Sequence, residues 1–313
     1  MIKRSFFKLP IIFSLTYYIF SVLVSMGWLV SALLKRGDDY FWEIFPMYAS
    51  NMFIQHLKSL FLYFVVVAIL CYRYRIHKVS GRNIGMIFIA VLLAMVCQTA
   101  LGYLWSMSAM SLLQYYALDM SWMIVAQMIF GFVILIVMTL IVIFLFRLLA
   151  PMAEREEPFE FDGNNFGWVH GVLFTASLMT VFIILGLYAL SSFIQYSYYY
   201  SDVYNIVFFL GIILGLMIHI FFIYFSVRRC FTQVYDTLQV ARIFKSAGIT
   251  LVILIGVSIV FGLIMSVFGM MYLNSRDWGA LIIFGFVCIL LALVVNYVSL
   301  FLSSRFAVRQ YFS

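Results

Sequence analysis

The sequence predicts an all-α integral membrane protein, a bundle of about eight transmembrane helices, and three observations support that prediction. Of the 313 residues, 66% are hydrophobic and only 10% are charged, whereas a soluble domain has about 25% charged residues. Apolar runs of about 18 residues or more recur along the chain, which is the pattern of transmembrane helices. Short polar and basic segments separate these runs. We therefore expect a single polytopic membrane domain over residues 1–313.

The expected spans follow one another along the whole chain. They are residues 10–34, 53–72, 84–105, 121–149, 167–193, 205–227, 249–272 and 280–301. The first run is longer than the core of a signal peptide and lacks an A-x-A site, which predicts an uncleaved span. Residues 35–51 are expected to form an outer loop. The basic loop 228–248 is expected to hold a short amphipathic surface helix.

The polar segment 151–166 is the natural midpoint of the chain. It divides the sequence into halves 1–150 and 151–313, each with four spans and a basic loop between its second and third span. Because four is even, two such halves would be parallel rather than inverted repeats. The sequence is compatible with two parallel four-helix halves and with one undivided bundle.

The basic residues are distributed unevenly between the two sides of the predicted bundle. With eight spans, both termini lie on one side. If that side is the cytoplasm, only Lys35, Arg36, Lys58 and Arg276 of the 19 lysines and arginines fall outside. This positive-inside bias predicts a multi-pass protein of the cell (inner) membrane with cytoplasmic N- and C-termini. The net charge of +7 thus indicates topology and not a nucleic-acid partner.

Small residues at helical spacing predict the packing faces. Gly211 and Gly215 are four residues apart in the sixth span, a spacing that lets a neighbouring helix approach closely in lipid. In the seventh span, Ser258, Gly262 and Ser266 form a similar stripe. We expect both faces to lie against other helices.

Polar side chains inside the spans are the candidate functional residues. His219 lies four residues after Gly215, and by depth its expected partners are Asn296 in the eighth span or His170 near the inner end of the fifth. Such groups either join helices by hydrogen bonds or line a polar path. If these three residues line a cavity, it would open toward the cytoplasm. Gln98, in the third span, is open to the same two interpretations.

The sequence lacks the familiar catalytic and metal-binding motifs. Cys71, Cys97, Cys230 and Cys288 form no C-x-x-C pair, and no H-E-x-x-H, Walker-type or G-x-S-x-G motif occurs. We therefore expect no cofactor, no metal ion and no catalysis. The middles of the spans also lack acidic and basic residues, which argues against ion-coupled transport.

Three kinds of function fit this pattern. The first is a protein that acts through partners in the lipid bilayer, as a regulatory, assembly or immunity-type protein, with a membrane protein partner or as a homo-oligomer. The second is a permease or channel for a small neutral or amphipathic molecule. The third is a lipid-modifying membrane enzyme. The lack of acids in the spans favours the first over a coupled transporter, and the lack of clustered interfacial acids or histidines disfavours the third.

The charge bias gives a direct test of topology. Reporter domains fused after Ser313 and after Tyr200 should read cytoplasmic and external, respectively, because the basic loops stay on the cytoplasmic side. Opposite readings, or two readings on the same side, would contradict the eight-span arrangement.

Overall fold

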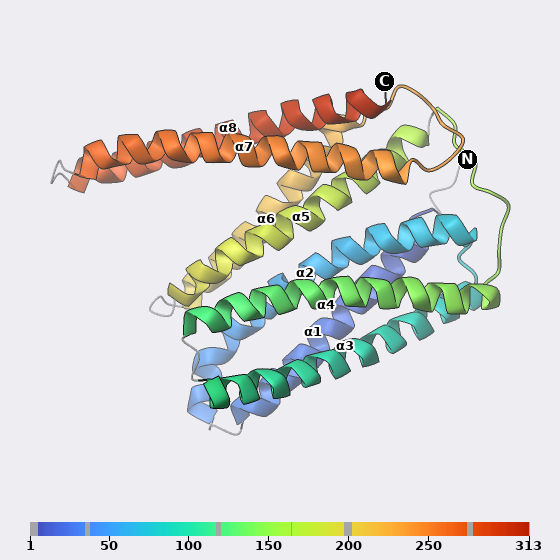
Figure 1. Cartoon of the computed structure of the whole chain (residues 1–313), viewed down its shortest axis with the longest axis horizontal. Coiled ribbons are helices and arrows are strands. Elements are labelled where there is room, and N and C mark those ends of the chain that lie inside the picture. Colours follow the sequence, from blue (N-terminus) through green and yellow to red (C-terminus); the bar gives the residue numbers. More distant parts are fainter. Residues whose placement is uncertain are drawn as a thin grey trace. The chain divides into compact units, whose positions relative to one another are not determined.

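The chain folds into long helices joined by short connections. The computed structural model describes residues 6–34, 38–116, 120–163, 165–196, 202–273 and 278–312, and within these ranges it contains no strand. The elements are α1 (Lys8–Leu34), α2 (Asp38–Tyr74), α3 (Gly81–Tyr116), α4 (Met120–Leu149), the short helix η1 (Ala150–Met152), α5 (Phe166–Tyr196), α6 (Asp202–Val227), α7 (Val240–Leu273) and α8 (Trp278–Phe312) (Figure 1). Eight of them are long and apolar enough to span a membrane. The predicted all-helical class with eight candidate spans is thereby confirmed.

Three segments differ from the prediction. Residues 38–50, expected in a loop, belong to α2, and α3 continues to Tyr116. The surface helix expected within 228–248 does not form before Val240. Its backbone is used in another way, because the N–H groups of Thr232 and Gln233 both donate to the carbonyl oxygen of Phe312, each at 3.1 Å. A segment that gives its amides to another part of the chain cannot use them for its own helix.

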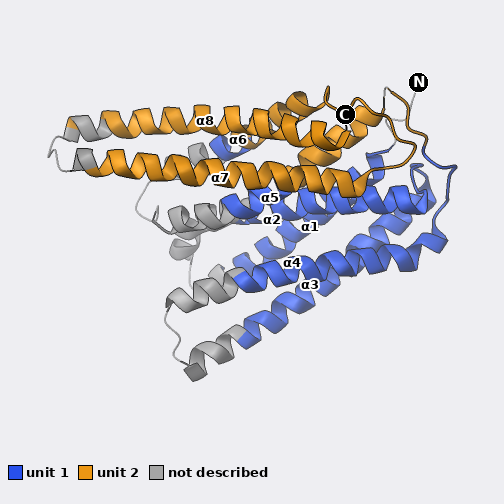
Figure 2. Ribbon diagram, turned by 45° about the horizontal axis from the view of Figure 1, so that its top comes forward, with its two compact units in different colours: residues 1–159, 179–213 blue, residues 160–178, 214–313 orange. Residues whose placement is uncertain are grey.

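The chain divides into two compact units, which Figure 2 distinguishes by colour. The first unit comprises residues 1–159 and 179–213, and the second comprises residues 160–178 and 214–313. The division after Phe159 lies close to the predicted midpoint, but α5 and α6 are each shared between the units.

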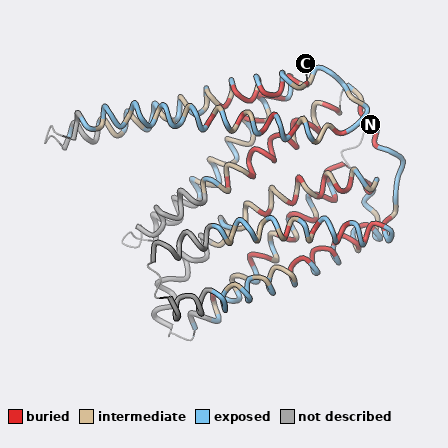
Figure 3. Tube along the Cα trace, in the orientation of Figure 1, coloured by how far each residue is buried: buried red, intermediate tan, exposed pale blue. Residues whose placement is uncertain are grey.

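In the first unit, α1 packs against α2 and α3, and α4 packs against α2 and α3. Phe13, Tyr17, Tyr63 and Phe146 are fully buried at the centre of this bundle. In the second unit, α7 pairs with α8, and a 3.0 Å hydrogen bond between Ser226 and Ser304 joins α6 to α8. Buried residues gather toward the helix ends that carry the 75–80 and 228–239 connections (Figure 3).

The predicted packing glycines are not in close helix contacts within the described part of the chain. A Cβ atom built on Gly211, Gly215 or Gly262 meets no atom within 4 Å. Ser258 and Ser266 are exposed, and the Ser266 hydroxyl donates to the carbonyl oxygen of Gly262 in its own helix at 2.8 Å.

The close glycine contacts instead belong to another pair at the same spacing, Gly167 and Gly171 at the start of α5. A Cβ on Gly167 would lie 3.3 Å from the carbonyl oxygen of Arg228, and one on Gly171 would lie 3.4 Å from the Tyr224 ring. These two glycines therefore let α5 meet the end of α6 closely.

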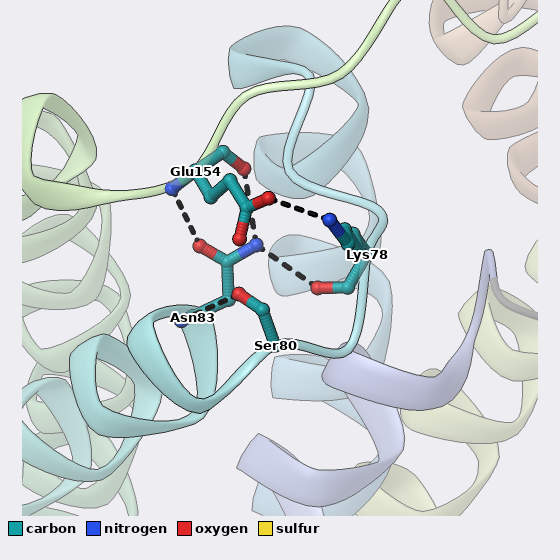
Figure 4. A network of polar contacts seen from close by, with 4 residues as sticks. All are labelled: Lys78, Ser80, Asn83 and Glu154. Atoms are coloured by element: carbon teal, nitrogen blue, oxygen red, sulfur yellow. Dashed lines mark hydrogen bonds and ion pairs between the residues drawn. The ribbon is translucent and has the colours of Figure 1, made fainter.

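A polar network ties the connection after α4 to the start of α3 (Figure 4). The Asn83 amide group is buried, and its nitrogen donates to the carbonyl oxygens of Lys78 at 2.9 Å and Glu154 at 3.1 Å. Its oxygen accepts the N–H of Glu154 at 2.8 Å. At the surface, the Lys78 ammonium donates to the Glu154 carboxylate at 2.6 Å. Asn83 thus holds the polar segment 151–166 to the start of α3.

Replacing Gly171 tests the α5 contact. Gly171→Leu should destabilise the protein by about 1–3 kcal/mol, because the new side chain has to displace Tyr224 or Phe231. Gly215→Leu is the matched control, since it meets open space. Thermal unfolding of both variants in mild detergent checks this expectation. Equal destabilisation of the two would contradict it.

The Asn83 network predicts different outcomes for its buried and exposed parts. Asn83→Ala should cost about 1–3 kcal/mol, because it removes the three hydrogen bonds that the buried Asn83 amide makes to the backbone of Lys78 and Glu154. The hydrogen bond from Lys78 lowers the pKa of the Glu154 carboxyl. The contribution of the ion pair to stability is therefore fully present at a pH above the ordinary carboxyl pKa, and it is lost as the pH falls through the lowered pKa. Both groups are exposed, so Glu154→Gln should change stability little.

Unfolding curves at neutral pH, with carboxyl NMR of Glu154 during acidification, measure both effects. A midpoint for Glu154 at or above the ordinary value of about 4.3 would contradict the ion pair. A loss of unfolding free energy in Glu154→Gln as large as that in Asn83→Ala would contradict the predicted difference between the exposed and the buried part of the network.

Candidate functional site

A cavity of about 150 Å³, open on one side and lined by polar side chains over part of its wall, lies in the first unit between α1, α2, α3 and α4. Its polar lining consists of Tyr17, Gln55, His56, Lys58, Ser59, Tyr63 and Gln98. Gly131, Ile134, Leu135 and Met138 of α4 form an apolar wall. All of these residues fall within the candidate spans, so the cavity is set among helices that are otherwise strongly apolar.

The polar side of the cavity continues along one face of α1. Tyr17, Ser21 and Ser25 follow one another at a spacing of four residues, which places them in one row. The Tyr17 hydroxyl donates to Oε1 of Gln98, and the Ser21 hydroxyl approaches the same oxygen at 3.4 Å. At the next turn, Ser25 Oγ lies 2.9 Å from Nε2 of His56. The row therefore joins α1 to both α2 and α3.

Aromatic packing fixes the inner wall of the cavity. The rings of Tyr17 and Tyr63 meet edge to face, with centroids 4.6 Å apart and planes at 72°. Phe13 stacks beside Tyr17 at 6.1 Å, and all three side chains are at most 1% exposed. A phenol held between such neighbours presents its hydroxyl in a fixed place, which is what a selective binding site requires.

Lys58 gives the cavity its charge. It is half-buried, and the lining described above contains no acidic side chain. The apolar spans cannot solvate an ammonium group, so a charged Lys58 needs water, the neighbouring oxygens or an anionic ligand. The sequence had placed Lys58 on the outer side of the membrane, without any role inside the bundle.

The three predicted site residues lie in the second unit and bond to other partners. His219 Nδ1 is 2.8 Å from the carbonyl oxygen of Gly215 and 3.3 Å from the hydroxyl of Tyr297. His170 is buried; its Nδ1 is 2.9 Å from the carbonyl oxygen of Phe166, and its Nε2 accepts the N–H of Gln239 at 3.1 Å. Asn296, next to Tyr297 in the chain, is exposed. These contacts fit the interpretation in which His170 and His219 join segments; a cavity formed by the three residues stays a prediction.

The residues of the cavity were largely missed at the sequence level, with Gln98 as the exception. Hydropathy averages hide serine and tyrosine, because neither lowers the mean of an apolar run strongly. The four-residue spacing of Tyr17, Ser21 and Ser25 was the available signal. Lys58 lies five residues after Phe53, the expected start of the second span. This position and the spacing on α1 together indicate a polar face shared by α1 and α2.

Comparisons with known proteins add no relative. The chain matches no family model, and no curated protein or solved structure is significantly similar to it. Among the described residues, no three His, Cys, Asp or Glu side chains come together in a group that could hold a metal ion. Inferences about function therefore start from the cavity.

Proposed function

We propose that this chain is a multi-pass membrane protein that binds a small molecule with an anionic or strongly hydrogen-bonding group in the cavity of its first unit. This proposal belongs to the permease or channel class. The observation behind it is the lysine-containing cavity lined by Tyr17, Tyr63 and Gln98 among apolar spans.

Each lining residue has a role in this proposal. Lys58 supplies the positive charge that a carboxylate or phosphate group would meet. Gln98 Oε1 already accepts from Tyr17, so the amide NH₂ group of Gln98 is the one directed to a ligand acceptor. Ile134 and Leu135 offer an apolar surface on the opposite side. Since drug-sized sites are about 300–1,000 Å³, a cavity of about 150 Å³ suits a molecule or headgroup of only a few heavy atoms.

The sequence favoured the partner-mediated class of function. Because of the cavity, we now favour the permease or channel class. A half-buried lysine beside two ordered phenols supports ligand binding, because an anionic group would offset the cost of keeping the ammonium group in an apolar setting. The apolar faces of α7 and α8 suit lipid as well as a protein partner, so they do not favour the partner-mediated class. The lipid-modifying class has no comparable support in the described residues.

Location and orientation are part of the same proposal. The positive-inside bias supports the cell (inner) membrane with both termini in the cytoplasm. Lys58 then lies in the outer half of its span, so the cavity would be reached from the external side or the outer leaflet.

Replacing Lys58 tests the proposed binding. The purified protein is screened in mild detergent against acetate, lactate, phosphate and glycerol phosphate for a rise in Tm. A ligand present at a hundredfold its Kd would stabilise by about 2.7 kcal/mol. Lys58→Met should abolish the rise caused by any binding anion, because the positive charge is removed. Lys78→Met, an exposed lysine of the same unit, is the matched control.

Two results would contradict the proposal. One is a Tm rise that survives in Lys58→Met. The other is the absence of any rise across the panel while size-exclusion chromatography shows the wild-type protein to be folded.

A further inference from the structure

One face of α8 near its end combines positive charge with apolar surface. Phe301, Arg305 and Arg309 follow at a spacing of four residues, and Leu302, Phe306 and Gln310 form a second row beside them. These six residues, here named the α8 face, line a broad surface hollow of about 720 Å³. The face is separate from the cavity of the first unit, and the inference does not depend on that site.

The α8 face is positioned by the opposite side of the same helix. Ser303, Ser304, Ala307 and Val308 are buried, and Ser304 is hydrogen-bonded to Ser226 of α6 at 3.0 Å. The turns that carry the arginines are therefore fixed against the second unit. Leu302 and Phe306 are each 59% exposed, so the apolar row points away from it.

Arg305 has an N–H group that no other residue of the described part of the chain accepts. The Arg305 guanidinium lies 4.8 Å from the centroid of the Phe301 ring. Among the described residues, its buried Nε has no hydrogen-bond partner. A guanidinium stacked on a ring keeps its N–H edges free for a planar, two-point contact with a phosphate or carboxylate.

Arg242 provides the contrast. Its guanidinium donates to the Tyr311 carbonyl oxygen at 2.9 Å and to the Tyr235 hydroxyl, and it lies 4.2 Å from the Tyr235 ring centroid. Arg242 is thus occupied by the protein itself. The lining of the α8 face contains the guanidinium groups of Arg305 and Arg309, the Gln310 amide and no acidic side chain.

We infer that the α8 face binds the headgroup of an anionic phospholipid. The charges lie in the last turns of a candidate span, Ile283–Phe312, where lipid headgroups meet a transmembrane helix. Arg305 and Arg309 contact the phosphate, and Gln310 donates to a headgroup oxygen. Leu302 and Phe306, one row away, lie along an acyl chain. A soluble anion would leave that apolar row unused, and a phospholipid uses both rows.

The test is native mass spectrometry of the full chain after incubation with mixed micelles of equal phosphatidylglycerol and phosphatidylcholine. The wild-type protein should retain phosphatidylglycerol preferentially. The double variant Arg305→Gln/Arg309→Gln should lose that preference by about thirtyfold, from about fivefold for each basic residue near an anionic headgroup. The double variant Arg82→Gln/Arg147→Gln is the matched control, because it removes two exposed arginines at helix ends of the first unit.

Each other outcome would overturn the inference. A preference retained in the α8 variant, or lost equally in the control, means that no specific lipid site exists there. Displacement of phosphatidylglycerol by equimolar inorganic phosphate would mean a soluble-anion site. If the α8 double variant does not fold, Arg309→Gln alone, a change at an exposed position, should still lower the preference about fivefold, and an unchanged preference there is equally decisive.

Discussion

Lipid offers no hydrogen-bond partner, so a polar side chain within an apolar span is most stable where the chain itself satisfies it. Most hydroxyl groups meet this constraint locally. Those of Thr99, Thr139, Thr175 and Thr250 donate to the carbonyl oxygen four residues earlier, at 2.7–2.9 Å. Tyr17 and Ser25 instead bond to side chains of α3 and α2. Beside the cavity, these polar groups both join the helices and line the space.

In each unit, a polar side chain in the first turn of one helix bonds to the backbone near the end of the following helix. In the first unit, the third residue of α3, Asn83, bonds to the backbone just after α4. In the second unit, the third residue of α7, Arg242, donates to the backbone at the end of α8. A buried histidine lies among aromatic rings near each of these connections, His77 in the first unit and His170 in the second. The two histidines lie at different places in the two halves of the chain, and the division into two parallel four-helix halves stays a prediction.

Hydropathy predicted the class of the fold because it depends on a sum over many residues, and no single side chain decides it. Packing was harder, since it depends on which face of a helix meets protein and which meets lipid. Gly211 and Gly215 have the same spacing as Gly167 and Gly171, yet only the second pair has close neighbours among the described residues. In a helix that is apolar all round, the hydrophobic pattern does not show which face meets protein and which meets lipid. The aromatic residues Tyr224 and Phe231 supply the partner surface, and they lie about 50 residues or more from those glycines in the chain.

The same limit explains why the sequence pattern pointed to residues of the second unit and not to the cavity of the first; a site formed by His219, His170 and Asn296 stays a prediction. Histidine and asparagine stand out in an apolar run, whereas serine and tyrosine do not, so the sequence pattern points to His219 and not to Tyr17. Yet a polar residue that stands out can be accounted for by contacts that join helices, as His219 is by the Gly215 carbonyl oxygen and the Tyr297 hydroxyl. A binding surface needs several donors that converge from different helices. That convergence is a property of the bundle, because Tyr17, Lys58 and Gln98 come from three helices and meet only after those helices have packed.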